Sequence, residues 1–276
     1  MLKAIFFLIT TLAPSLYLNA QYYYKDIVTN KQVLGEMARL KEEKIKVIDV
    51  KSFEGDGIPS DGFFCEKNIN RTYTLVETHI KSNVTGPSVF TSLFNKKGLL
   101  TKTIDSSTIT TNISEYEYTE TDQLKNIRSI IRSSDDDFTN EVREEHVYQY
   151  NDKGLLYKMI RIKNMTDSSD ILFSTDEKNN ISIEKDTKTG NTYYYYYDNK
   201  NRLTDVVHLN KFNQQMLPDY IFEYNSTGLI TQMTTTEEGS SYYYIWKYIY
   251  DNGLRIKEKC YSKEKRLMGT IEYEYK

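Results

Sequence analysis

The sequence predicts an all-β protein: a repetitive antiparallel β-meander of hairpins that forms an open twisted or curled sheet, with one short N-terminal helix. Three observations predict this fold class. A short frame of aromatic and polar residues recurs along the chain, β-branched and aromatic residues alternate with polar ones between its copies, and no helical period follows residue 50.

The repeated frame is clearest at residues 193–208, where a run of five tyrosines ends at Tyr197 and a second strand leaves through Val206 and Val207. Its fifth residue, counted from the residue before the turn, needs a positive backbone φ, which Gly adopts freely and Asn and Asp tolerate best among the rest. That position holds Gly98, Asp122, Gly154, Asn179, Asn201 and Gly228. A seventh, shorter copy ends in Asn-Gly at Gly253, the preferred pair for a two-residue type I′ turn. We therefore predict a hairpin turn at each of these seven positions.

Residues 1–20 have the features of an export signal. Lys3 precedes an apolar core at residues 4–12, and a cleavage site follows at Ala20. The apolar run is shorter than the roughly 20 residues that span a bilayer, and no cysteine stands at the junction where a lipoprotein would carry one. We expect an exported mature chain, periplasmic or extracellular, with no transmembrane segment after cleavage.

Residues 21–62 are predicted to form an N-terminal cap of one helix and one strand. Apolar residues fall at helical spacing between residues 31 and 44, and Asn30 is a suitable N-cap. A strand is expected at residues 45–53, before a Gly- and Pro-rich loop. Because so short a helix is marginal alone, we expect it to cover one end, edge or face of the sheet.

Residues 63–276 are predicted to form the hairpin repeat domain. From Arg71 onward, strands alternate with short polar turns down to Lys276, with no change of composition that would mark a linker. An open meander has two edge strands, and each must be capped or paired. The N-terminal helix and the charged last strand are the candidates for these two tasks.

The tyrosine-rich runs supply the candidate ligand-binding residues. Exposed rings in these runs would form a stacking platform for a glycan or a partner protein, whereas aromatic cross-strand pairs would simply stabilise the sheet by about 0.2–1 kcal/mol each. Both interpretations stay open at this point. The candidate residues are Tyr193, Tyr195, Tyr197, Tyr244, Trp246 and Tyr248.

Several kinds of site find no support in the sequence. Removing Lys3 with the export signal leaves a net charge of −4 without a basic stripe, so no nucleic-acid partner is expected. The three histidines, His79, His146 and His208, have no metal-ligand spacing, and the acidic run at residues 135–137 lacks a calcium-loop pattern. No nucleophile, base and orienting residue can be assembled, and no cofactor fingerprint occurs. We expect no metal, no cofactor and no enzymatic activity.

Cys65 and Cys260 are the two cysteines of the chain. In an oxidising compartment they would form a disulfide that closes a long loop, if the two ends of the sheet meet. The alternative is a pair of unrelated thiols.

The frame Tyr-x-Tyr-(Asn/Asp)-x-x-Gly-(Leu/Arg)-Leu, seen at residues 148–156 and, with Asn201 for Gly, at residues 195–203, resembles the YD repeat of the RHS family. It is also similar to small exported YD-like proteins of Bacteroidetes-type bacteria. The resemblance covers about residues 90–276. It implies a repetitive β-sheet at the cell envelope, and no catalytic residue carries over. The chain has neither a core-terminating motif nor a C-terminal toxin segment, so the cargo-enclosing role of large RHS proteins is not expected.

Taken together, these features predict an exported, non-catalytic binding or structural module at the cell envelope, whose exposed tyrosine face meets a glycan or another envelope protein. The alternative is a periplasmic carrier that encloses a lipid or other apolar ligand in a curled half-barrel.

Overall fold

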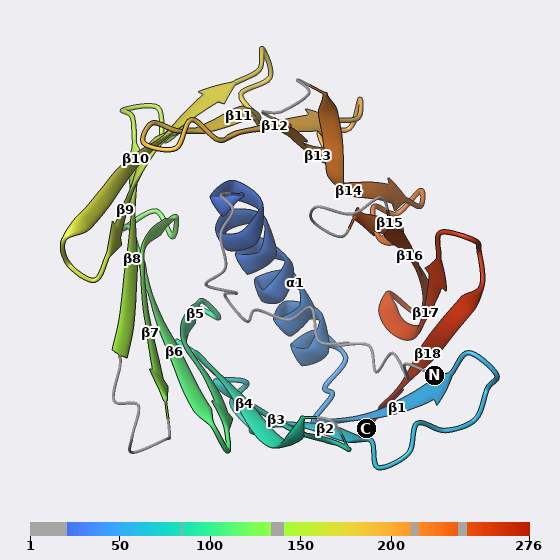
Figure 1. The fold of residues 1–276 in the computed structure, drawn as a ribbon. Coiled ribbons are helices and arrows are strands. Elements are labelled where there is room, and N and C mark those ends of the chain that lie inside the picture. The colour runs from blue at the N-terminus through green and yellow to red at the C-terminus, as the bar shows by residue number, and fades with distance from the viewer. Residues whose placement is uncertain (1–20, 84, 134–140, 211–214, 237–241) are drawn as a thin grey trace.

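The predicted hairpins are present, and they close into a barrel. Within the residues that this computed structural model describes, 21–83, 85–133, 141–210, 215–236 and 242–276, eighteen antiparallel strands follow one another around the wall in chain order (Figure 1). The first strand closes the ring because it pairs with both the second and the last strand. The predicted export signal at residues 1–20 lies outside the described residues.

The wall consists of β1 (Val47–Glu54), β2 (Phe64–Ile69), β3 (Leu75–Ser82), β4 (Gly86–Phe94), β5 (Leu100–Ser107), β6 (Thr110–Tyr118), β7 (Leu124–Ser133), β8 (Glu141–Tyr150), β9 (Leu156–Lys163), β10 (Asp167–Thr175), β11 (Ile181–Asp186), β12 (Thr192–Tyr197), β13 (Leu203–Leu209), β14 (Met216–Tyr224), β15 (Ile230–Thr236), β16 (Tyr243–Asp251), β17 (Leu254–Ser262) and β18 (Leu267–Tyr275).

The prediction of an open or curled sheet is therefore wrong. β1 and β18 pair along almost their whole length, from Ile48 opposite Tyr275 to Glu54 opposite Gly269. The repeat specifies each hairpin locally, but whether the first and last strands meet depends on twist and shear summed over the whole sheet. Closure removes the two edges that an open meander would have to protect.

The turns have the backbone conformation that the repeat requires. All seven predicted positions have positive φ, from 59° at Asn201 to 89° at Gly228, and Asn252 joins Gly253 at positive φ in the short Asn-Gly turn. In each case the strand register shifts at the residue before the turn, for example between Tyr196 and Tyr197. Each repeat thus ends in a β-bulge, which bends the strand and increases its twist.

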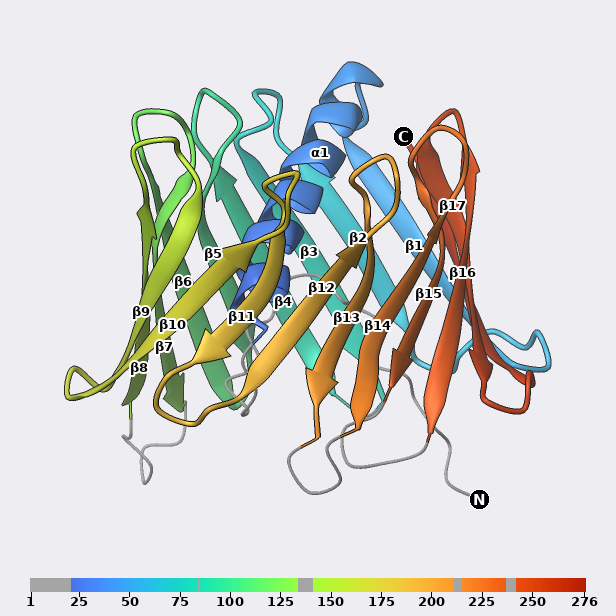
Figure 2. The same ribbon diagram turned by 90° about the horizontal axis from the view of Figure 1, so that it is seen from above.

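A helical segment lies inside the barrel, formed by the π-helix η1 (Tyr23–Val28) and the α-helix α1 (Thr29–Glu42) (Figures 1 and 2). The helix predicted at residues 31–44 is present as α1, and of the expected places, an end, an edge or a face of the sheet, it occupies a face, the one that the closed wall turns inward. Its buried side chains include Ile27, Met37 and Leu40. An eight-stranded barrel is filled by wall side chains alone, whereas eighteen strands enclose a wider lumen that needs further filling.

The core consequently lies between the helix and the inner surface of the wall. Side chains alternate along each strand, so in β12 Tyr193 and Tyr195 are buried while Tyr196 is exposed. The outer surface carries cross-strand ion pairs such as Lys102–Glu115 and Arg128–Glu117. In the described part of the chain, neither helix has the length and apolar character that crossing a bilayer requires.

Candidate functional site

The candidate tyrosines do not form an exposed platform. Tyr193, Tyr195, Trp246 and Tyr248 are all at least 92 % buried in the core, and Tyr197 and Tyr244 are half-buried. The expectation that these side chains form an exposed aromatic face of the sheet is therefore wrong. The closed wall turns one set of alternating side chains inward, and the repeated tyrosines belong to that set.

Five tyrosines of the repeated frame have a structural task. In each, the ring packs inward and the hydroxyl donates to the backbone carbonyl of the first or second residue of a strand in the preceding hairpin. The donor and acceptor pairs are Tyr150 and Leu124, Tyr197 and Ile181, Tyr224 and Leu203, Tyr250 and Ile230, and Tyr275 and Arg255, at 2.6 to 2.8 Å. We call this set the tyrosine ladder, and it links neighbouring repeats.

A charged cluster fixes the start of the helical segment to the wall. His146 of β8 contacts Asp26 of η1 through Nδ1 at 2.6 Å and Glu144 through Nε2 at 2.9 Å. Tyr148 donates to the same Asp26 carboxylate at 2.5 Å, and Arg161 of β9 donates to Glu144 at 3.3 Å. Within the barrel, the cluster joins the helix to two strands.

The cluster holds its imidazole in the charged form. Burial alone would lower the pKa of His146, but Asp26 and Glu144 outweigh it and raise that pKa to about 9. Burial alone would likewise raise the pKa of Glu144, but His146 and Arg161 lower it to about 2. Because both imidazole nitrogens donate to carboxylates, His146 offers no lone pair for general-base catalysis.

Another acid, Glu184 of β11, caps the N-terminal end of the helical segment. Its two carboxylate oxygens accept the backbone N–H groups of Tyr22 at 3.0 Å and Tyr23 at 2.9 Å, and the Tyr195 hydroxyl donates to it at 2.7 Å. Burial raises the pKa of Glu184 to about 7, although these three donors favour its charged form. Neither η1 nor α1 has a side-chain N-cap of its own, so the wall supplies the acceptor for the free N–H groups.

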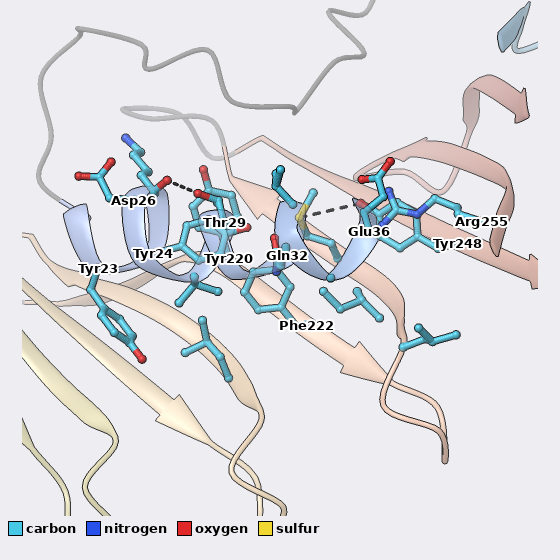
Figure 3. Close-up of a pocket in the computed structure, with 18 of the residues that line it drawn as sticks. Tyr23, Tyr24, Asp26, Thr29, Gln32, Glu36, Tyr220, Phe222, Tyr248 and Arg255 are labelled. Atoms are coloured by element: carbon cyan, nitrogen blue, oxygen red, sulfur yellow. Dashed lines mark hydrogen bonds between the residues drawn. The ribbon is translucent and has the colours of Figure 1, made fainter. Parts of the chain in front are cut away.

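A cavity of about 1030 Å³ remains between the helix and the wall. In Figure 3, Gln32 and Glu36 of α1 border it from the helix, and Phe222, Tyr248 and Arg255 border it from the wall. Gly35 also lines it, and a Cβ atom added there would have no neighbour within 4 Å. The cavity volume lies at the upper end of the usual range of about 300–1,000 Å³ for small-molecule pockets.

An arginine is held against aromatic rings at one end of this cavity. The Arg255 guanidinium lies 4.2 Å from the Tyr248 ring centroid and donates to Glu258 at 2.9 Å. Tyr273 donates to the same Glu258 oxygen at 2.6 Å. Stacking and hydrogen bonding thus fix the position of a cation in a largely aromatic surrounding.

The two cysteines are not joined. Cys65 in β2 and Cys260 in β17 are separated by β18 and β1, so three strand spacings of roughly 4.8 Å each lie between them. A disulfide requires Cα atoms within about 7 Å. Burial raises the pKa of the Cys65 thiol to about 11 and that of Cys260 to about 12, so both are inert apolar fillers. Of the two alternatives, the structure therefore has two unrelated thiols.

No group of three or more potential metal ligands is found among the described residues. The acidic run at residues 135–137 lies outside the described part of the chain. His208 of β13 contacts Asp219 of β14 at 2.9 Å, which accounts for it as a cross-strand pair.

The residues that organise the site were not identified from the sequence alone. Asp26, Glu144, His146, Glu184 and Arg255 each look like ordinary polar positions in a helix or strand. Strand parity carries part of the signal, because Glu184 shares the inward side of β11 and β12 with Tyr193 and Tyr195. A charged residue at an inward position predicts a buried partner.

Comparisons with known proteins give only distant structural likenesses. No protein-family model and no curated protein matches the chain. Among solved structures, it is similar to a porin-like protein from Bacteroides uniformis, with 13 % identity, a TM-score of 0.42, and 84 % of this chain and 96 % of that one covered. A porin-like protein from Bacteroides vulgatus gives 12 % identity, a TM-score of 0.34, and coverages of 84 % and 99 %.

A third likeness is to the TcdB2-TccC3-Cdc42 structure, with 15 % identity and a TM-score of 0.34. It covers 77 % of this chain but 12 % of that one, so this chain spans about an eighth of its length. All three TM-scores are below 0.5, so these likenesses do not indicate a function for this chain.

Proposed function

We propose that this protein is an exported, non-catalytic binding protein that carries an apolar or amphiphilic ligand in its lumen, between α1 and the wall. The observation that carries this proposal is the luminal cavity of about 1030 Å³. Its lining combines aliphatic and aromatic side chains such as Leu40, Ile48 and Phe222 with a few fixed polar groups. This combination is typical of small-molecule sites.

The charged side chains on the outer surface support the interpretation that the wall faces water. Lys102–Glu115, Arg128–Glu117 and similar pairs stand on it, with side chains 32 to 52 % exposed. Such pairs contribute little stability each, but on a lipid-facing wall a charged side chain would cost roughly 2–4 kcal/mol near the bilayer midplane. A water-facing wall around an apolar lumen suits a carrier better than a membrane pore.

The absence of catalysis is part of the proposal. His146, the one histidine that contacts the helical segment, is held between two carboxylates. Glu184 is held by three donors from η1, β12 and the residue before η1. Both groups are used to anchor the helix: both ring nitrogens of His146 are engaged, and Glu184 is not among the residues that line the cavity.

A cavity-filling variant tests the proposal. Gly35→Phe places a ring at a position that lines the cavity, where the added Cβ atom meets no neighbour within 4 Å, and it removes a glycine that costs a helix about 0.5–1 kcal/mol. We expect this variant to fold and to bind the neutral apolar dye N-phenyl-1-naphthylamine at least several-fold more weakly than the wild type. Ala38→Phe, on the same helix but away from the cavity lining, is the matched control and should bind as the wild type does.

Fluorescence titration of the three proteins gives the result. Saturable dye binding that Gly35→Phe weakens and Ala38→Phe leaves intact supports a luminal site. Absence of saturable binding to the wild type, or equal affinity for Gly35→Phe, would contradict the proposal.

A further inference from the structure

Two guanidinium groups border the same end of the luminal cavity. Arg39 belongs to the last turn of α1, and Arg255 stands at the start of β17. Arg39 packs against Gly253, two residues before Arg255, so closely that a Cβ atom at Gly253 would collide with its Nη1. The helix and the wall therefore each bring one cation to the β16–β17 hairpin.

The charges at this end of the cavity do not cancel. The lining residues near the β16–β17 hairpin include three cations, Lys67, Arg39 and Arg255, against two carboxylates, Glu36 and Glu258. Glu36 lies 3.6 Å from Lys67, and Glu258 is bound by Arg255. Among the described residues, Arg39 forms no ion pair within 4 Å, so it is the cation left without a counter-charge.

Arg255 also has N–H groups that remain available to a further acceptor. A guanidinium has five N–H groups in a planar fork, and Arg255 donates from Nη1 to Glu258. Its side chain remains 38 % exposed, and stacking on Tyr248 holds the plane in position. A fixed, partly open guanidinium is suited to binding a carboxylate or phosphate group.

Apolar side chains also line the cavity. Val33 of α1, Val50 of β1 and Phe222 and Met233 of β14 and β15 border it, whereas the charged cluster of Asp26, Glu144, His146 and Arg161 lines another part of it. An elongated ligand with its head group at the two arginines would thus find hydrocarbon and aromatic surface for its apolar part.

We propose that the lumen takes an acidic amphiphile, with its anionic head group between Arg39 and Arg255 and its apolar part along α1. This inference rests on the proposed function and specifies the ligand class for that same cavity. The head group supplies the counter-charge that Arg39 lacks.

The test compares two probes of equal chain length, dodecanoate and 1-dodecanol, by displacement of bound N-phenyl-1-naphthylamine at pH 7.5. Because a hydrogen bond to a charged group contributes about 1.5–3 kcal/mol, the wild type should bind dodecanoate about tenfold or more tightly than dodecanol. Arg39→Gln should remove this preference by weakening dodecanoate alone, and Arg39→Lys should restore part of it.

Arg39 is the position to change because Arg255→Gln would leave Glu258 without its cation inside the barrel. Arg71→Gln, which makes the same charge change at an exposed residue outside the cavity lining, is the control and should match the wild type. Equal affinity for both probes, or an unchanged preference in Arg39→Gln, would overturn the acidic head group. Failure of both probes to bind would instead overturn the luminal carrier, and this inference with it.

Discussion

At the scale of single residues, the tyrosine hydroxyl explains why tyrosine suits the position before each turn. Phenylalanine would fill the same inward space, as Phe94 does in the frame that ends β4. Only tyrosine can also reach the carbonyl at the start of a neighbouring strand, as in the 2.6 Å bond from Tyr224 to Leu203. The ring contributes apolar burial and the hydroxyl fixes the distance between repeats.

Tyr224→Phe should therefore lower the free energy of unfolding by about 1 kcal/mol, because the Leu203 carbonyl loses a buried donor while the ring is retained. Tyr196→Phe, on the exposed side of β12, should change it by much less. Urea unfolding followed by circular dichroism gives both values. Equal effects of the two substitutions would show that the ladder bonds do not stabilise the repeats.

Local chemistry predicts the backbone conformation of some single residues but not the partners of others. Positive φ at Gly98, Asn201 and the other turn positions follows from the residue types in the turn itself. The partners of Glu184 and His146 cannot be predicted in this way. The bond from Tyr22 to Glu184 spans 162 residues and that from Asp26 to His146 spans 120. No local sequence pattern around Glu184 or His146 predicts these bonds.

At the scale of elements, hairpins and helix were predictable but the place of the helix was not. The spacing of Val33, Met37 and Leu40 predicts an amphipathic helix. It does not say whether the apolar side meets the end of an open sheet or the inside of a closed one. The helix lies inside because the inner surface of the wall carries both the apolar side chains and the polar groups, Glu184 and His146, that bind its N-terminal end.

The charged cluster between η1, β8 and β9 predicts a specific dependence of stability on pH. The pKa of His146 is raised from its ordinary 6.5 to about 9 in the folded protein. A histidine raised in this way stabilises the fold fully below pH 6.5, and its contribution is lost as pH rises through about 9. The shift corresponds to about 3 kcal/mol at the acidic end of this range.

His146→Gln should thus be less stable than the wild type by about 3 kcal/mol or more at pH 6, with the difference shrinking as pH approaches 9.5. Urea unfolding of both proteins across this range measures it. Taking the difference between the two proteins removes the contributions of titrating groups outside the cluster. A gap that stays constant with pH would mean that the cluster does not hold a charged imidazole.

At the scale of the whole molecule, closure converts a repetitive sheet into a container. The β1–β18 pairing places residues near the two ends of the described chain side by side, and no local signal in the sequence encodes that contact. The same closure turns the repeated tyrosines inward and brings Cys65 and Cys260 to within three strand spacings, which is still too far for a disulfide. It also leaves the luminal cavity beside α1. The predicted exposed binding face depended on an open sheet, whereas the predicted disulfide needed the two cysteines on neighbouring strands.

The most direct test of a luminal binding site is native mass spectrometry of the protein purified from the organism that makes it, before and after denaturation. We expect the native protein to carry an added mass that is released on unfolding and behaves as an acidic amphiphile in negative-ion mode. Protein that is free of any added mass, and that also fails to take up dodecanoate or 1-dodecanol when supplied, would contradict the carrier proposal.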